Sequence, residues 1–277
     1  MKTAVANALA PLPRMVYEPV VRAALVEDFG LGGDLTSEAC VPSGARAKAS
    51  LVARAPGVLA GLDCALAAFS ILDPNAAFSI RVSDGEDVAA GTAIARIECD
   101  ARALLGAERP ALNLLSHLSG IATATARYVV AAGGRATIAE TRKTLPGLRA
   151  LQKYAVRAGG GANHRFRLDD AILIKDNHIA LAGGVAAALD GAHARAGHLV
   201  KIEIEVDTLA QLDEVLAHPG GADVILLDNF SPAAIAEAVS RTRGRALLEA
   251  SGGIVPALHG ARARAGHLVK IEIEVDT

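Results

Sequence analysis

The sequence predicts an α/β protein in two parts, and three observations support this prediction. Residues 1–108 hold short alternating apolar runs broken by Asp84-Gly85 and Gly91, a pattern typical of antiparallel hairpins. From Ala136 onward, short β-branched runs alternate with Ala-rich helical stretches, which indicates parallel strands joined by crossover helices. At 277 residues, the chain is long enough for a small domain followed by an open parallel sheet or a barrel.

Two helices are expected beyond residue 108. In "ERPALNLLSHLSGIATATARYVVAA", apolar residues recur at helical spacing from Leu112 to Ile121, and Pro110 suits a first turn. We therefore expect this helix to begin near Arg109. The segment "LPGLRALQKYAVRAG" repeats the same spacing, which predicts a second, shorter helix.

Composition excludes several classes of protein. Three Tyr, five Phe and no Trp leave few platforms for stacking bases, and a net charge of −2 is not that of a duplex-binding protein. We therefore expect no nucleic acid partner. Three widely spaced cysteines indicate a reducing compartment, and no apolar run approaches the roughly 20 residues that cross a bilayer. The start "MKTAVANALAPLP" resembles a signal peptide only weakly, so we expect a cytoplasmic protein without membrane contact.

One segment occurs twice. "GAHARAGHLVKIEIEVDT" at 191–208 returns as "GARARAGHLVKIEIEVDT" at 260–277, and the copies differ only at His193 and Arg262. A single close repeat without a period elsewhere is not the signature of a solenoid. A recent duplication or a chimeric C-terminus accounts for it more readily.

The stretch from Arg142 to Arg167 contains no acidic residue. Its seven Lys and Arg, with His164 as a further candidate cation, are concentrated in a chain that is otherwise near neutral. Because the composition argues against nucleic acid, we expect these cations to bind a small, dense anion. Arginine clamps carboxylate and phosphate oxygens with two parallel hydrogen bonds, whereas lysine acts as a point charge.

Polar residues follow every predicted parallel strand, at the ends where such folds collect function. The strands are "ATIAE", "AILIK", "VKIEIEV", "ADVILLD" and "ALLEASGG". The residues at their carboxyl ends are Thr141, Arg142 and Lys143, then Lys175, then Glu205, then Asp228, and finally Ser251, Gly252 and Gly253. Each signal alone is typical of a turn or a solvated strand end, but five strands ending in this way favour a site.

Glu205 and Asp228 are the predicted metal ligands. Glu203 and Glu205 share one face of their strand, and Glu205 is the better candidate because it lies nearer the carboxyl end. Two carboxylates opposite a polyphosphate are a usual anchor for Mg²⁺, which keeps waters and takes further ligands from the substrate. Zinc is not expected, because the histidines show no close pairing in the sequence and no cysteine lies nearby.

Six segments resemble the quinolinate phosphoribosyltransferase family. They are "ALNLLSHLSGIATATARYV", "ETRKTLPGLRALQKYAVRAGGGANHR", "LIKDNH", "EIEVDT", "LLDNF" and "EASGG", within a resemblance that covers about residues 15–254. The family implies an N-terminal open-faced α/β sandwich (1–108), an incomplete α/β barrel (109–254) and, here, an atypical tail (255–277). It also implies a homodimer, or a hexamer of dimers, with shared active sites. The implied reaction converts quinolinate and phosphoribosyl pyrophosphate to nicotinate mononucleotide, pyrophosphate and CO₂ with Mg²⁺.

The resemblance also assigns roles to residues of this chain. Arg109 would reach the partner subunit's site, and Thr141, Arg142, Lys143, His164 and Arg165 would hold the carboxylates of quinolinate. Lys175, Glu205 and Asp228 would surround the ribose and the pyrophosphate, while Ser251, Gly252 and Gly253 would lie near the 5′-phosphate. Lys143, Lys175, Glu205 and Asp228 are the predicted catalytic residues.

The family continues beyond "SGG" with a further phosphate loop, which the repeated segment replaces here. The tail therefore bears on barrel closure and on the 5′-phosphate site.

Three alternatives to this function stay open. A related enzyme could act on another aromatic acid, and Lys175 could form a Schiff base in a barrel lyase. The basic stretch could instead belong to a module that binds anions or RNA without turnover.

Overall fold

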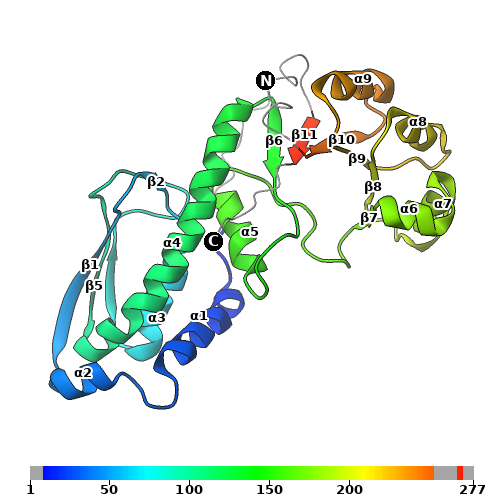
Figure 1. Cartoon of the computed structure of the whole chain (residues 1–277). Helices are drawn as coiled ribbons and strands as arrows, with labels where there is room; N and C mark the ends of the chain where they lie inside the picture. The colour runs from blue at the N-terminus through cyan, green and yellow to red at the C-terminus, as the bar shows by residue number, and fades with distance from the viewer. Residues whose placement is uncertain (1–8, 253–266, 271–277) are drawn as a thin grey trace. The chain divides into compact units, whose positions relative to one another are not determined.

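The structure is a computed structural model that describes residues 9–252 and the backbone of 267–270 (Figure 1). The chain divides into two compact units, which are described separately below. The first contains residues 1–126 and 144–160, and the second contains residues 127–143 and 161–277. Within the described residues, no helix combines the length and apolar character needed to cross a membrane.

The first unit contains a three-stranded antiparallel sheet and its helices. Its elements are α1 (Arg14–Phe29), α2 (Leu35–Cys40), β1 (Arg46–Val52), β2 (Gly57–Val58), α3 (Leu62–Leu72), β3 (Ala77–Ile80), β4 (Asp87–Val88), β5 (Ala93–Asp100), most of α4 (Ala101–Ala132) and α5 (Arg149–Ala158). The sheet order is β1-β5-β3, and β2 pairs with β4. Leu51 and Ile97 are buried, whereas Lys48 and Arg96 are exposed, so one face packs and the other stays open. The predicted antiparallel, open-faced arrangement is confirmed.

The helix expected to begin near Arg109 begins much earlier. α4 runs without interruption from Ala101 to Ala132 and carries Pro110 inside it. The side chain of Asp100 accepts hydrogen bonds from the backbone N–H groups of Arg102 and Ala103, at 2.9 and 3.1 Å, and so caps the true start. Placing Pro110 in the first turn was therefore wrong, because the cap at Asp100 and a helix-forming run outweigh a proline that removes one backbone hydrogen bond.

The second unit contains the predicted parallel strands. Its elements are the end of α4, β6 (Ala136–Ala139), β7 (Ile172–Ile174), α6 (Asp176–Ala182), α7 (Val185–Arg195), β8 (Ile202–Val206), α8 (Leu209–Ala217), β9 (Val224–Asp228), α9 (Pro232–Thr242), β10 (Leu247–Ser251) and β11 (His267–Lys270). Strands β10, β9, β8 and β7 form one parallel sheet in that order. All five strands predicted between Ala136 and Gly253 are present, and the predicted α/β class is confirmed.

One face of this sheet is apolar and covered by helices. Ile204 of β8 and Ile225 of β9 are fully buried in a core that also includes Leu189 of α7, Leu212 of α8 and Ala238 of α9. Figure 1 shows these helices gathered along the sheet. Burying such aliphatic side chains contributes about 1.5–3 kcal/mol each, so this core holds the strands in register. The opposite face carries Glu203 and Glu205 of β8, Glu249 of β10 and Asp228 of β9.

The C-terminal copy of the repeat contributes a strand to the second unit. β11 pairs in parallel with β6, with His267 opposite Ala136 and Lys270 opposite Ala139. The strand is formed by "HLVK", whereas the first copy uses "IEIEV" for β8 and leaves "HLVK" in a turn. The second "IEIEV", like the rest of the tail, lies outside the described residues.

Candidate active site

The polar face of the β8–β10 sheet carries the predicted carboxylates. Glu205 of β8 and Glu249 of β10 both lie level with Leu226 of β9, so the three side chains share a face. Asp228 lies two residues beyond Leu226 and therefore also points to this face. Ile204 and Leu227 point the opposite way, into the helix-covered core. Strand alternation thus separates a structural face from a functional one.

Both oxygens of Asp228 are held in place by neighbouring side chains. The hydroxyl of Ser251 donates to Oδ1 at 2.6 Å, and the amide of Asn229 donates to Oδ2 at 2.7 Å. Asn229 has a φ of 53°, and Gly252 has a φ of +75°. A Cβ at Gly252 would collide with Asn229 Oδ1, so glycine is needed there both for the backbone conformation and for this close approach. Asn229 was not among the predicted site residues.

Glu205 and Lys175 meet at the carboxyl ends of neighbouring strands. Lys175 Nζ donates to Glu205 Oε2 at 2.9 Å, and the two side chains are 47% and 12% exposed. The backbone N–H of Lys175 donates to Nδ1 of His178 at 2.9 Å, which fixes the start of α6. The ion pair is open to solvent on the lysine side and is therefore available to a ligand.

Arginines form the cationic part of the site. Burial lowers the pKa of the Arg165 guanidinium from its ordinary value, and the neighbouring charge of Arg142 lowers it further. Arg165 Nη1 donates to the carbonyl of Ala171 at 3.1 Å, but its Nε is buried and has no hydrogen-bond partner among the described residues. The guanidinium groups of Arg142 and Arg165 repel each other, and the buried Nε of Arg165 can still donate a hydrogen bond. Both features suit an anionic ligand.

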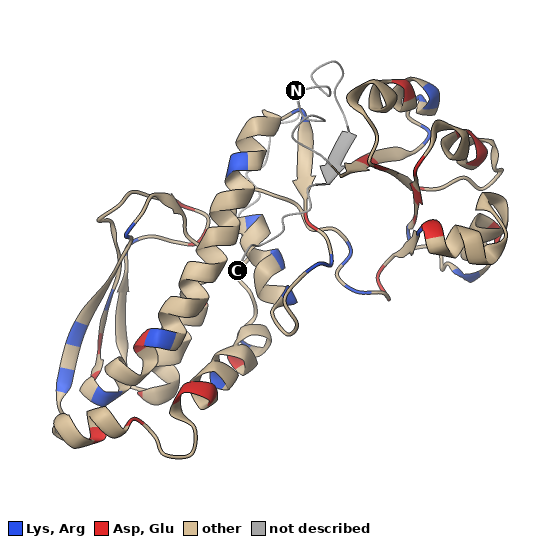
Figure 2. Cartoon of the chain, viewed as in Figure 1, with Lys and Arg blue, Asp and Glu red and all other residues tan. Residues whose placement is uncertain are grey.

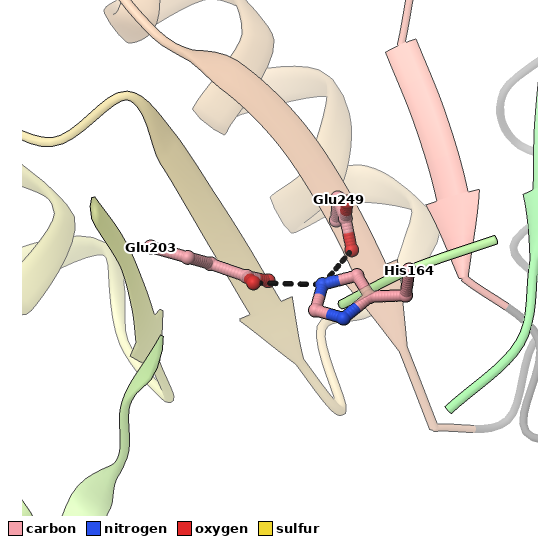
Figure 3. A group of neighbouring side chains, drawn as sticks. All are labelled: His164, Glu203 and Glu249. Atoms are coloured by element: carbon pink, nitrogen blue, oxygen red, sulfur yellow. Dashed lines mark hydrogen bonds and ion pairs between the residues drawn. The ribbon is translucent and has the colours of Figure 1, made fainter. Parts of the chain in front are cut away.

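His164 lies between carboxylates that the sequence prediction left out. Its ring is 2.7 Å from Glu203 and 3.6 Å from Glu249, and its backbone N–H points at Glu140 (Figure 3). Glu140, Glu203 and Glu249 are all buried. Glu205 and Asp228 are therefore not the only carboxylates on the polar face. Strand alternation could have suggested Glu203, but only the strand register brings it together with Glu249.

The structure gathers most of the predicted site residues in the second unit. Figure 2 shows acidic positions along its parallel strands and basic positions along the segments that follow β6 and precede β7. The residues placed there are Thr141, Arg142, Lys143, His164, Arg165, Lys175, Glu205, Asp228, Ser251 and Gly252. Arg109 lies in the first unit, within α4, and Gly253 lies outside the described residues. The roles predicted for these residues stay predictions.

The basic stretch from Arg142 to Arg167 is divided between the two units. Arg149, Lys153 and Arg157 belong to α5 in the first unit, where Lys153 is fully buried and Arg157 is exposed. Arg149 donates to the hydroxyl of Thr144 at 3.1 Å. The second unit contains the remaining cations of the stretch, Arg142, Lys143, Arg165 and Arg167.

The carboxylates at the strand ends fit a hard divalent cation. Asp228 presents two oxygens, each using one lone pair in its hydrogen bond, and Glu205 shares one oxygen with Lys175. Oxygen-only ligands on one face suit Mg²⁺, which binds through one or two carboxylates and keeps its waters. A parallel sheet whose ends carry clustered cations beside such carboxylates defines an α/β enzyme for anionic substrates.

Comparison with known proteins identifies the family. Residues 34–119 match the family model "Quinolinate phosphoribosyl transferase, N-terminal domain", and residues 121–258 match the corresponding C-terminal domain. The chain therefore belongs to the quinolinate phosphoribosyl transferase family. The second copy of the repeat, at 260–277, lies beyond the matched residues.

Individual relatives agree with this assignment. The chain is 48% identical over 240 residues to the nicotinate-nucleotide pyrophosphorylase [carboxylating] of Mycobacterium leprae, covering 84% of each chain. It is 45% identical to a probable enzyme of the same name from Bacillus subtilis, over 85% of this chain and 82% of that one. The crystal structure of NadC from Streptococcus pyogenes superposes with a TM-score of 0.88 at 40% identity, covering 94% of this chain and 93% of that one.

Proposed function

We propose that this chain transfers the phosphoribosyl group of phosphoribosyl pyrophosphate to quinolinate, with loss of CO₂, to give nicotinate mononucleotide and pyrophosphate. The observation that carries the proposal is the half-buried Arg165, whose pKa is lowered by the charge of Arg142 and whose buried Nε has no hydrogen-bond partner among the described residues. Two adjacent guanidinium groups match a dicarboxylate better than a single charge does. The names of the 48% and 45% identical relatives support the same reaction.

The residues divide into two groups around the two substrates. Arg142, Lys143, His164 and Arg165, with Thr141, hold the carboxylates of quinolinate. Lys175, Glu205 and Asp228 surround the ribose and the pyrophosphate, with Ser251, Gly252 and Gly253 near the 5′-phosphate. Holding two anions that repel each other in water in a reactive geometry can contribute about 7–11 kcal/mol to catalysis.

The reaction needs charge stabilisation rather than a covalent intermediate. The bond from ribose C1 to the pyrophosphate oxygen breaks, and the pyridine nitrogen supplies the electron pair for the new bond to C1. Carboxylates of Glu205 and Asp228 near C1 would stabilise the positive charge that develops there. The resulting pyridinium accepts the electron pair left when CO₂ departs, and a proton replaces the lost carboxylate.

Glu205 and Asp228 are also the residues that would hold Mg²⁺. The bound ion would neutralise charge on the departing pyrophosphate. The competing role of Lys175 as a Schiff-base residue is disfavoured, because its half-exposed ammonium pairs with Glu205 whereas such chemistry needs a desolvated amine. The three cysteines are free, which supports a cytoplasmic location.

A product assay tests the proposed function directly. With quinolinate, phosphoribosyl pyrophosphate and Mg²⁺, we expect the chain to release nicotinate mononucleotide, pyrophosphate and CO₂ in equal amounts. Nicotinate, which lacks the second carboxylate, is the matched control substrate and should give much slower transfer. Turnover of a different aromatic acid, with none of quinolinate, would contradict the substrate assignment.

We further propose a homodimer in which Arg109 serves the partner subunit's site. Arg109 is exposed on α4 and belongs to the unit that lacks the parallel sheet. We expect Arg109→Ala and Arg142→Ala chains, each inactive alone, to regain activity when mixed, because one site of a mixed dimer is intact. Recovery should approach about one quarter of the wild-type rate, as half the chains form mixed dimers with one working site of two. If labelled subunits exchange but no activity returns, the shared site is wrong.

A further inference from the structure

The polar face of the sheet holds two buried carboxylates, Glu203 and Glu249, that the proposed roles do not use. His164, Glu203 and Glu249 meet with side-chain exposures of 9%, 5% and 4%. The two carboxylates come from β8 and β10, which are separated by β9, and Figure 3 shows both reaching the same ring nitrogen. Two strands and a loop thus converge on one imidazole.

The geometry places one ring nitrogen of His164 against a carboxylate. Nε2 of His164 lies 2.7 Å from Glu203 Oε2, a hydrogen-bond distance, and 3.6 Å from Glu249 Oε2, an ion-pair distance. A carboxylate acceptor at the shorter distance would require the hydrogen to be on Nε2. The Nδ1 edge faces away from both carboxylates (Figure 3). Glu203 thereby holds the ring, and Glu249 contributes a second negative charge on the same side.

The main chain of His164 is fixed in the same manner. Its backbone N–H lies 3.2 Å from each oxygen of Glu140, which directly follows β6. Carboxylates from β8, from β10 and from the residue after β6 therefore determine where His164 sits and how its ring is turned.

Glu203 also interacts with Arg165, a second member of the set of residues proposed to hold quinolinate, which we call the quinolinate clamp. Burial and Arg142 lower the pKa of Arg165, and the charge of Glu203 opposes this and raises it. One oxygen of Glu203, Oε1, is buried without a hydrogen-bond partner among the described residues. A buried polar oxygen without a hydrogen bond costs stability, so the residue is poorly explained as a contributor to folding alone.

The alternative interpretation is that His164, Glu203 and Glu249 bind a metal ion. The candidate ligand atoms of His164, Glu203 and Glu249 all lie within 4.8 Å of one another. Around a tetrahedral zinc ion, however, nitrogen and oxygen ligands would stand about 3.3 Å apart. The 2.7 Å separation between His164 Nε2 and Glu203 Oε2 is that of a shared hydrogen.

We propose that Glu203 and Glu249 are positioning residues, which orient the His164 ring with its hydrogen on Nε2 so that its opposite edge faces the bound aromatic acid beside Arg165. The inference rests on the proposed function, because it assigns His164 to the quinolinate clamp. It adds to that function two buried carboxylates, Glu203 and Glu249, that orient one residue of the quinolinate clamp.

Substrate-specific kinetics test this proposal. Glu203→Gln should lower kcat/KM for quinolinate roughly 10- to 100-fold, as loss of an orienting partner does, and change KM for phosphoribosyl pyrophosphate by less than about three-fold. Glu249→Gln should have a smaller effect in the same direction, and Glu203→Asp should recover part of the loss. Glu214→Gln, an exposed carboxylate on α8, is the matched control and should leave both constants unchanged.

A double-mutant cycle separates positioning from general structural support. In a His164→Ala background, Glu203→Gln should cost less than about three-fold in kcat/KM for quinolinate, because its target is gone. Equal losses in both backgrounds, or equal effects on both substrates, would overturn the proposal. Loss of wild-type activity on treatment with EDTA that zinc but not Mg²⁺ restores would assign the group to a metal instead.

A measurement independent of activity completes the test. In protein labelled with ¹⁵N-histidine, the His164 ring should show its hydrogen on Nε2, and Glu203→Gln should alter that signal. Absence of turnover by the wild-type chain would overturn the proposed function while leaving this signal intact. A wild-type ring with no hydrogen on Nε2 would overturn the positioning role while leaving the function intact.

Discussion

Asp228→Ala is expected to lower kcat/KM for phosphoribosyl pyrophosphate by on the order of 10²- to 10³-fold, the loss typical of removing one preorganised electrostatic group. Both oxygens of Asp228 are already held, by Ser251 and by Asn229, so the carboxylate is rigid before any ligand arrives. Removing it also removes half of the predicted Mg²⁺ anchor. The Mg²⁺ concentration that gives half-maximal rate should therefore rise, whereas quinolinate binding measured by calorimetry should change little.

The control for Asp228 is a carboxylate on the helical layer of the same unit. Asp213 lies on α8, is 53% exposed and pairs with Arg241, so Asp213→Ala should leave kinetics and Mg²⁺ dependence unchanged. Asp228→Asn separates charge from shape, because it keeps an acceptor for Ser251 but loses the negative charge. An Asp228→Ala enzyme with wild-type turnover and wild-type Mg²⁺ dependence would remove Asp228 from the site.

The parallel strands could be predicted because their signal is local. Each of β6 to β9 is a short run that contains β-branched residues, β10 begins with two leucines, and alternation within "KIEIEV" separates the buried isoleucines from the glutamates. The polar residues at the strand ends follow from the same pattern. What alternation cannot give is the register between strands, and only the register brings Glu203 and Glu249 to one histidine.

Other features depended on competing local signals or on the tertiary environment. Pro110 suggested a helix start near Arg109, but the cap at Asp100 sets the start of α4 at Ala101. The segment "HLVK" is a turn at 198–201 and a strand at 267–270, where β6 offers a partner, so the same four residues take the conformation their surroundings favour. The left-handed backbone at Asn229 likewise follows from its packing against Gly252.

Arg165→Ala is expected to weaken the use of quinolinate by roughly 10- to 150-fold in kcat/KM, because a hydrogen bond to a charged group contributes about 1.5–3 kcal/mol. Arg165 is held by the carbonyl of Ala171 and keeps a buried Nε without a partner among the described residues, so a carboxylate would complete its hydrogen bonding. Arg165→Lys should recover little, since a point charge cannot reproduce the planar fork. Steady-state kinetics with each substrate varied in turn will measure both variants.

Arg167 is the matched control for Arg165. It lies two residues further along the same loop, is exposed and rests 5.8 Å from the centre of the Phe166 ring, so it has the same charge without the burial. Arg167→Ala should change quinolinate kinetics by less than about three-fold, because an exposed charge is screened by water and salt. If the two alanine variants lose equally, and added salt reproduces that loss in the wild type, the cations attract anions only diffusely. A selective loss at Arg165 that salt does not reproduce would instead locate a carboxylate against its half-buried guanidinium.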